Sequence, residues 1–564
     1  MDASSKTLLL LTLLSTHCLA ASVPHGVAAS NPMVLSSDGW LEGLRMTVKG
    51  TDQAVNAYLG VPFAKPPLGS RRFSAPQPAE PWTGVRNATS FPPTCLQSAQ
   101  MADKAGETLK MKFPKLPASE DCLYLNLYSP ANADENSKLP VMVWIHGGGL
   151  TMGSASLVHG SALAAHENLI VVCIQYRLGV TGFFSTGDEH ARGNWGFLDQ
   201  VAALQWVNRS ISAFGGDPTS VTIFGESAGG ISTSAHVLSS LSKGLFHKAI
   251  SQSGVLVFPG VVTNDVATIR GIAKMIANLS GCETTDSSTM VACMKRTPGA
   301  RFPNIEINQK VPFVPAVVDG HFLLKTPQEL LIGKEINAVP YLIGCNNHEF
   351  GWIIPMILGL PDLRNGMDRL SAEQFMVNAA PWLGEFSEFR HLIMEEYLGG
   401  AQDPFQIRDN FLDLFGDTMF AVQTVLRARY HRDAGLPTYL YEFQHRPSMF
   451  RDLKPPYVKA DHGDDLFFVL GVPFLDDIIS QDNFTEEERT LSKNMMKSFA
   501  NFARNGNPNG AGLCEWPLYG LTEEYLEINL QMKVASKLKD QRVTFWTQTL
   551  PKKIEEIKKQ RKGA

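Results

Sequence analysis

A serine between two glycines, directly after a short apolar run, is the sequence feature that most limits how this chain can fold. Residues 221–224 read Val-Thr-Ile-Phe and are followed by Gly-Glu-Ser-Ala-Gly, with the serine at position 227. In a strand–turn–helix of the form G-x-S-x-G, small residues let the chain turn sharply and expose the serine hydroxyl. The pattern is loose, so its meaning depends on the rest of the chain.

Apolar, strand-like segments alternate with helical ones on both sides of Ser227. A helix is predicted over 197–214, where Leu198, Val201 and Leu204 recur at three-residue intervals. Such alternation predicts an α/β fold with a large, mainly parallel central sheet and helices on both of its faces. Strands are expected at 123–128, 141–145, 170–176, 221–224, 249–252, 340–344 and 438–443.

Domain boundaries follow from the remaining segments. Residues 254–339 and 352–437 are helix-like and lack a linker composition, which favours helical insertions into one sheet. We therefore expect a single domain over 21–550, followed by a basic C-terminal tail over 551–564. Near the end of the domain, Thr485 and Glu488 form a capping-box pattern that predicts a helix.

The first twenty residues predict a secretory signal peptide. A leucine-rich core at 7–15 precedes Cys18-Leu19-Ala20, a small-x-small pattern that places the cleavage after Ala20. The core is shorter than the roughly 20 residues that span a bilayer, and no later segment is long and apolar enough. We expect a protein of the secretory pathway without a transmembrane segment.

Composition and charge narrow the function further. The 564-residue chain has a hydrophobic content of 44% and a formal net charge of −5, which gives no electrostatic reason to expect a nucleic-acid partner. Seven of the 8 cysteines remain after the signal, so at least one is unpaired. Cys173 is expected to be buried in a strand, and Cys345 and Cys514 to be free. Glycosylation sequons are expected to be used at Asn87, Asn278 and Asn483, whereas Asn208 lies in a predicted helix and is least favoured.

A glycine run supplies the second part that a nucleophilic serine needs. The negative oxygen of a tetrahedral intermediate is stabilised by backbone N–H groups, which glycines leave open to approach. His146-Gly147-Gly148-Gly149 directly follows the predicted strand 141–145 and matches the H-G-G-G arrangement found beside such a serine. The run therefore predicts an oxyanion hole.

A base and an acid should follow the serine, with the acid first in the chain. His462 lies in a polar, glycine-containing loop after the last predicted strand. Of its rivals, His247 comes too early and His348 adjoins a better-placed acid. His462 is thus the predicted base.

Glu349 is the predicted acid, because it follows the strand at 340–344. Asp319 is the main alternative, but it belongs to an Asp-Gly pair that is typical of a turn. The acid would fix the imidazole tautomer and stabilise its positive charge.

Taken together, these motifs resemble the type-B carboxylesterase family, and most closely the mammalian-type liver carboxylesterases. The resemblance runs from about residue 39 to 546. It rests on the serine, glycine-run, Glu349 and His462 segments and on three further stretches: 120–126, 193–196 and 214–218.

The resemblance implies an α/β-hydrolase fold and a serine carboxylesterase that needs no metal or cofactor. It implies a triad of Ser227, Glu349 and His462, which hydrolyses small-molecule or lipid esters through an acyl-enzyme. Other implied features are an oxyanion hole at Gly148, Gly149 and Ala228, a substrate pocket lined by Leu150, Ile353, Met419 and Phe420, and disulfides Cys95–Cys122 and Cys282–Cys293.

Other members of the family fit less well. Cholinesterases carry a tryptophan for the choline cation in the loop closed by the first disulfide, and residues 95–122 contain no tryptophan. The chain ends in Gly563-Ala564 rather than an H-x-E-L retrieval signal, which favours secretion over retention in the endoplasmic reticulum. A lipase or acyl-CoA thioesterase with the same triad is the alternative, and a non-catalytic secreted binding protein is a remote one.

Overall fold

The computed structural model of the protein describes residues 31–308, 314–379, 383–479 and 483–563. The predicted signal peptide lies outside these residues. Pro32–Ala564 form one compact unit.

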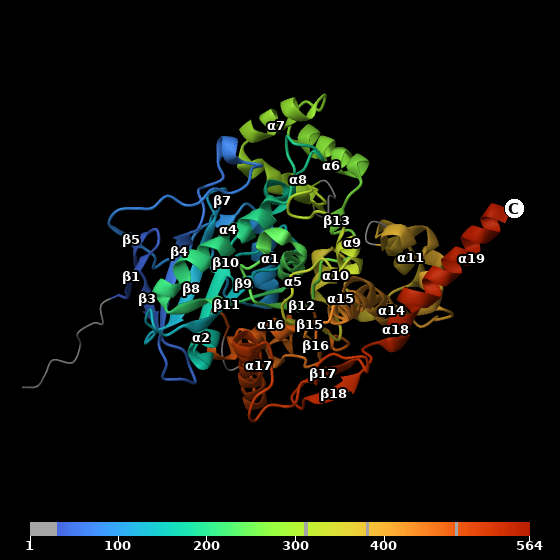
Figure 1. Cartoon of the computed structure of the whole chain (residues 1–564). Coiled ribbons are helices and arrows are strands. Elements are labelled where there is room, and N and C mark those ends of the chain that lie inside the picture. Colours follow the sequence, from blue (N-terminus) through green and yellow to red (C-terminus); the bar gives the residue numbers. More distant parts are fainter. Residues whose placement is uncertain (1–30, 309–313, 380–382, 480–482, 564) are drawn as a thin grey trace, which may run out of the picture. The chain divides into compact units, whose positions relative to one another are not determined.

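The central sheet has eleven strands, with the serine-bearing strand near its middle (Figure 1). From one edge to the other the order is β18 (Lys533–Ser536), β17 (Glu524–Ile528), β16 (Thr438–Phe443), β15 (Tyr341–Asn346), β12 (Lys248–Gln252), β11 (Gly216–Glu226), β9 (Leu139–Ile145), β10 (Ile170–Ile174), β8 (Tyr124–Pro130), β4 (Val55–Pro62) and β3 (Leu44–Met46). The strands from β17 across to β10 pair in parallel, and the pairs at both ends of the sheet are antiparallel. A mainly parallel sheet is what the alternation of strands and helices predicts.

Strand β9 shows why both faces of this sheet are covered. Val141, Val143 and Ile145 belong to one apolar cluster, whereas Met142 and Trp144 belong to another. Successive side chains of a strand point to opposite faces, so each face of the sheet contributes to its own core. A continuous apolar run of this kind is typical of a parallel strand buried between two helical layers.

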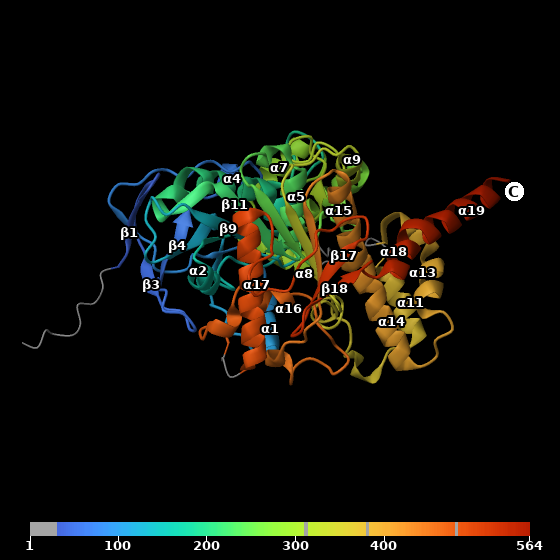
Figure 2. The same cartoon turned by 60° about the horizontal axis from the view of Figure 1, so that its bottom comes forward.

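Helices from distant parts of the chain form these layers (Figure 2). On one face, α4 (Trp195–Ser210) and α5 (Ala228–Leu238) contribute to the cluster that contains Val143. On the other face, α2 (Ser161–Glu167) and α17 (Glu486–Asn505) contribute to the cluster that contains Trp144. Helix α17 begins at the predicted capping box, in which Thr485 and Glu488 bind each other's backbone N–H, and it ends at Gly506 with φ +72°.

Both predicted insertions consist mainly of helices between neighbouring strands of the sheet. The first leaves the sheet after β12 and returns in β15, and the second leaves after β15 and returns in β16. The first contains α6 (Val266–Leu279), α7 (Ser287–Arg296), α8 (Phe302–Asn308), α9 (Pro327–Ile332) and the short strands β13 (Val262–Thr263) and β14 (Ala316–Val317). The second contains α10 (Ile353–Ile357), α11 (Arg369–Asn378), α13 (Arg390–Leu398), α14 (Pro404–Gly416), the π-helical turn η7 (Asp417–Ala421) and α15 (Val422–Asp433).

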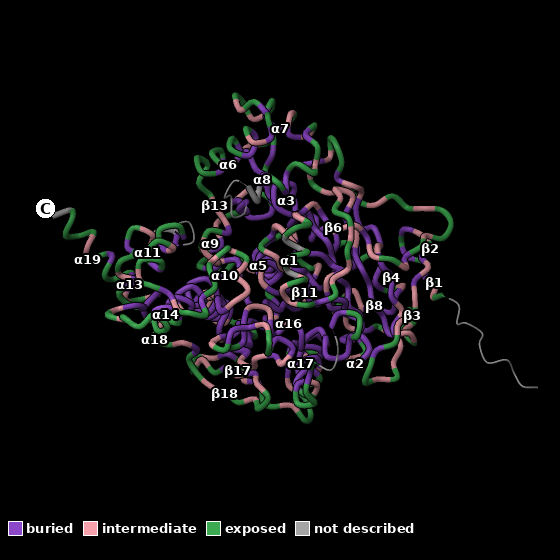
Figure 3. Tube along the Cα trace, turned by 180° about the vertical axis from the view of Figure 1, so that it is seen from behind, coloured by how far each residue is buried: buried purple, intermediate pink, exposed green. Residues whose placement is uncertain are grey.

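Smaller elements complete the described chain. A three-stranded sheet is formed by β1 (Met33–Ser36), β2 (Gly39–Glu42) and β5 (Val85–Asn87), and β6 (Thr94–Cys95) pairs with β7 (Ala118–Ser119). The remaining helices are α1 (Ala99–Leu109), α3 (Gly179–Phe183), α16 (Asp464–Val469), α18 (Asp540–Thr544) and α19 (Leu550–Gly563). Most of the predicted basic tail therefore lies in α19, where Leu550 and Ile554 are buried and most other side chains are exposed (Figure 3).

The sequence did not predict β17 and β18, which follow the last of the predicted strands, 438–443, in the chain. The two strands read Glu-Tyr-Leu-Glu-Ile and Lys-Val-Ala-Ser, and charged residues interrupt the apolar pattern. Strand β18 is the edge strand of the sheet, and β17 lies between β18 and β16. Strand β11 also begins earlier than expected, at Gly216, with an irregular pairing before Val221. Within the described ranges, no helix has the length and apolar character required to cross a membrane.

Candidate active site

Ser227 lies at a sharp turn between β11 and α5, as the G-x-S-x-G pattern predicts. Its backbone has φ 57° and ψ −122°, a conformation that non-glycine residues rarely adopt. The turn requires close approach of two backbones, since a Cβ at Gly229 would lie 1.9 Å from the carbonyl oxygen of Ile145. The Ser227 N–H donates to the carbonyl of Gln252 at 2.9 Å, which ties the turn to β12.

The glycine run lies in the loop after β9 and faces this turn. An added Cβ at Gly147 would lie 3.1 Å from the Cβ of Ser227. Gly148 has φ +103°, and a Cβ there would lie 2.2 Å from the carbonyl oxygen of Met152. In the described part of the chain, the N–H groups of Gly148 and Gly149 donate to no backbone carbonyl. Ala228 is the first residue of α5, where an N–H has no acceptor within the helix.

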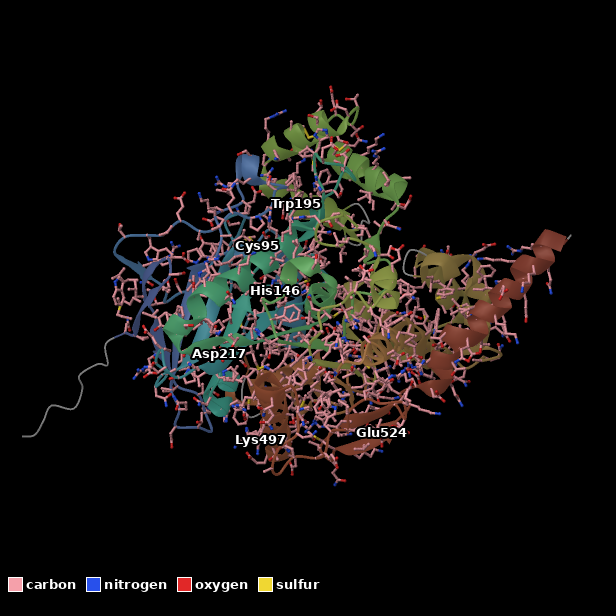
Figure 4. All side chains as sticks on the ribbon, in the orientation of Figure 1. Cys95, His146, Trp195, Asp217, Lys497 and Glu524 are labelled. Carbon is pink, nitrogen blue, oxygen red and sulfur yellow. A yellow bond between two sulfur atoms is a disulfide. The ribbon has the colours of Figure 1, made fainter. Side chains whose placement is uncertain are left out.

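His146, which is labelled in Figure 4, lies at the start of the glycine run, and its contacts give it a structural role. Its ring stacks on Tyr176 with 4.4 Å between centroids, and the Tyr176 hydroxyl donates to the His146 carbonyl at 2.8 Å. Burial lowers the pKa of His146 to about 4, so its ring is neutral at neutral pH. These contacts fix the loop that carries Gly148 and Gly149.

The structure brings His462 and Glu349 together. His462 Nδ1 lies 2.6 Å from Glu349 Oε2; the Glu349 side chain is buried, and that of His462 is 10% exposed. The other oxygen of Glu349 accepts from the Ser253 hydroxyl and from the Asn346 N–H, each at 2.6 Å. With Glu349 accepting from Nδ1, the lone pair of a neutral imidazole is on Nε2.

Glu226 also contacts His462, which the sequence did not predict. Glu226 immediately precedes the candidate nucleophile in the chain, and its Oε1 lies 3.2 Å from His462 Nε2. Burial raises the pKa of Glu226 to about 8, while the nearby His462 partly opposes that rise. Burial lowers the pKa of His462, but the charges of Glu226 and Glu349 outweigh this effect and raise it to about 9.

The Glu226→Gln variant is expected to move the acidic limb of the pH–kcat/KM profile to lower pH. A carboxylate favours the protonated imidazole, so removing its charge lowers the pKa of His462 and yields the neutral base at lower pH. The shift should be about one pH unit. The profile is measured with a soluble ester, and the exposed Glu135→Gln serves as the control; an unmoved limb in Glu226→Gln would show that this carboxylate does not act on the base.

The rival residues make other contacts. His247 Nδ1 accepts from the Val221 N–H at the beginning of the serine strand's apolar run. His348 accepts from the Lys459 N–H, and the Asp319 carboxylate accepts three backbone N–H groups within its own turn. Among the described residues, the carboxylates within 4 Å of the His462 ring nitrogens are those of Glu226 and Glu349.

Of the residues expected to line a pocket, Phe420 contacts His462 and Ile353 contacts its neighbour in the chain. The Phe420 ring, in the π-helical turn η7, lies 4.7 Å from the His462 ring. Ile353 is half-buried at the start of α10, and its N–H donates to Asp461, the neighbour of His462. Leu150 follows the glycine run and is buried, and Met419 is buried beside Phe420.

The cysteines and sequons agree with a chain built for an oxidising compartment. Disulfides join Cys95 to Cys122 and Cys282 to Cys293, and Cys173, Cys345 and Cys514 are free. All four sequon asparagines are exposed: Asn87, Asn208, Asn278 and Asn483.

Across the described ranges, no group of three or more His, Cys, Asp or Glu side chains is arranged to hold a metal ion.

Comparison with known proteins gives a single answer. The model of the carboxylesterase family matches residues 30–546. The chain belongs to the carboxylesterase family. This carboxylesterase is 49% identical over 553 residues to "Carboxylesterase 1D" of Rattus norvegicus, covering 95% of this chain and 96% of the relative. It is also 49% identical over 543 residues to "Fatty acyl-CoA hydrolase precursor, medium chain" of Anas platyrhynchos (96% of each chain) and 49% identical over 530 residues to "Cocaine esterase" of Oryctolagus cuniculus (94% of this chain, 98% of the relative).

Family membership confirms two predictions. The carboxylesterase has the α/β-hydrolase fold, and its doubly covered sheet is the expected architecture. It is a carboxylic-ester hydrolase, so the remote alternative of a non-catalytic binding protein is not supported.

Proposed function

We propose that this carboxylesterase hydrolyses esters through an acyl-enzyme on Ser227. His462 accepts the proton of the Ser227 hydroxyl as that oxygen attacks the ester carbonyl, and it returns the proton to the leaving alcohol. Water then attacks the acyl group with the same base, releasing the acid and restoring the serine. Glu349 orients the imidazole and stabilises its positive charge.

The observation that carries this proposal is the 2.6 Å contact between His462 Nδ1 and Glu349 Oε2. It leaves Nε2 as the proton acceptor, and Nε2 lies 3.2 Å from the side chain of Glu226, the residue before Ser227. This contact supports a place for the proposed base beside the chain segment that carries the proposed nucleophile. The N–H groups of Gly148, Gly149 and Ala228 complete the arrangement as donors to the oxyanion.

The proposed substrates are small-molecule or lipid esters. The Phe420 ring places apolar surface beside His462, which suits an acyl or alcohol group without charge. A second candidate is hydrolysis of acyl-CoA thioesters, favoured by the similarity to the fatty acyl-CoA hydrolase of Anas platyrhynchos. We also propose entry into the secretory pathway, which the two disulfides support.

A hydrolysis profile tests this function. Wild-type protein is assayed with p-nitrophenyl acetate, a long-chain triacylglycerol and a medium-chain acyl-CoA, before and after treatment with a fluorophosphonate. The proposal predicts hydrolysis of the soluble ester and loss of that activity after treatment. A higher kcat/KM for the acyl-CoA would favour the thioesterase, and full activity after complete modification of a serine would contradict a serine esterase.

A further inference from the structure

A buried ion cluster lies directly behind the proposed base. Lys454 is 4% exposed, and Asp461 and Asp464 on either side of His462 are 0% and 1% exposed. The Lys454 ammonium pairs with Asp464 Oδ1 and lies 3.9 Å from Asp461 Oδ2. Removing charged groups from water is costly, so a lysine held here has a specific structural reason.

The two aspartates hold different parts of the site. Asp464 Oδ2 accepts the N–H of Asp461 at 2.7 Å and so closes the loop that carries His462. Asp461 accepts the N–H groups of Trp352 and Ile353 at 3.1 and 3.0 Å. Those two residues follow Glu349 in the chain, so Asp461 joins the loop of the base to the segment of the acid.

Further contacts join the same two segments. The His348 N–H donates to the Ala460 carbonyl at 3.0 Å, and the Asn346 side-chain amide donates to the Asp461 carbonyl at 2.7 Å. The Lys454 ammonium also lies 5.9 Å from the centroid of the Trp352 ring. Lys454 therefore contacts both segments, although it lies outside each of them.

We propose that Lys454 is a positioning residue for the esterase reaction: its ammonium holds Asp461 and Asp464 so that His462 stays in register with Glu349. This inference rests on the proposed function, because it gives His462 and Glu349 the roles of base and acid. Lys454 touches neither residue directly and acts through the two aspartates.

The charged groups around His462 allow the proposal to be tested through the pH dependence of kcat/KM. The groups facing its ring are Glu226 from β11, Glu349 from the segment after β15, and Asp461 from its own loop, besides the uncharged Phe420 ring. Asp461 raises the pKa of His462, and Lys454 compensates the charge of Asp461. Removing the ammonium should therefore raise the pKa of His462 further and move the acidic limb to higher pH.

The test compares Lys454→Met with wild type in kcat, KM and the pH–kcat/KM profile. We expect kcat to fall about 10- to 100-fold with little change in KM, because a misplaced base slows turnover. We also expect the acidic limb of the pH–kcat/KM profile to move to higher pH. The control is Lys248→Met, a lysine that is 9% exposed at the start of β12 and contacts Ser220. A folded Lys454→Met variant with the same kcat as wild type, and with the acidic limb of its pH–kcat/KM profile at the same pH, would overturn the proposal.

A second variant decides the matter if Lys454→Met does not fold. Lys454→Met combined with Asp464→Asn removes one positive and one negative charge. Position 464 then carries a neutral amide instead of an unpaired carboxylate. We expect this double variant to fold and to keep the acidic limb of its pH–kcat/KM profile close to that of wild type. Its kcat should still be low, because Asp461 no longer has the Lys454 ammonium beside it. Wild-type kcat in the double variant would overturn the positioning role. Failure of the wild-type protein to hydrolyse esters would instead contradict the proposed function.

Discussion

Replacing Ser227 by alanine is expected to lower kcat for a soluble ester by about a millionfold, with the fold intact. The hydroxyl is the proposed attacking atom, and without it His462 has no proton to accept. Ser227 is only partly buried, and alanine removes one oxygen without adding volume, so the turn between β11 and α5 should persist. Residual hydrolysis would come from the oxyanion donors and from substrate binding.

Steady-state kinetics with p-nitrophenyl acetate measure this loss. Ser240→Ala is the matched control, because Ser240 is exposed in the turn after α5. A Ser227→Ala protein with more than a small fraction of wild-type kcat would exclude Ser227 as the nucleophile.

Replacing Glu349 by glutamine has the second-largest expected effect, a fall in kcat of about 10⁴-fold. The amide keeps the shape of the side chain but removes the charge that stabilises the imidazolium. Its NH₂ group can also donate to Nδ1, which would favour the wrong tautomer of His462. KM should change little, since in the proposed mechanism Glu349 acts through His462 and not on the substrate.

The same change at Asp319 provides the comparison. Asp319→Asn should keep wild-type kcat, since the Asp319 carboxylate accepts N–H groups of its own turn. Wild-type turnover in Glu349→Gln together with a large loss in Asp319→Asn would reverse the assignment of the acid.

Features that depend on local sequence were predictable. The turn at Ser227 needs small neighbours within two residues, and the capping box of α17 needs only Thr485 and Glu488 at the right spacing. Each pattern carries its own physical reason within a few positions. The pair of His462 and Glu349 spans 113 residues, and it was predictable only because chain order within this kind of fold limits the candidates.

Features that depend on long-range packing were not predictable. Nothing in the neighbourhood of Glu226 indicates that its carboxylate turns toward His462, since that contact exists only once β11 and the loop before α16 are adjacent. Lys454 is likewise buried because Phe450, Trp352 and the two aspartates pack around it. Strands β17 and β18 lack a continuous apolar run, since β18 is the edge strand, β17 lies next to it, and each strand keeps some residues exposed.

Locating the covalent adduct of a fluorophosphonate tests the central claim most directly. The protein is treated with the probe, digested, and analysed by mass spectrometry for the modified peptide. The proposed mechanism predicts one phosphonylated residue, Ser227, and no labelling of the Ser227→Ala variant. An adduct on another serine, or equal labelling of wild type and Ser227→Ala, would contradict it.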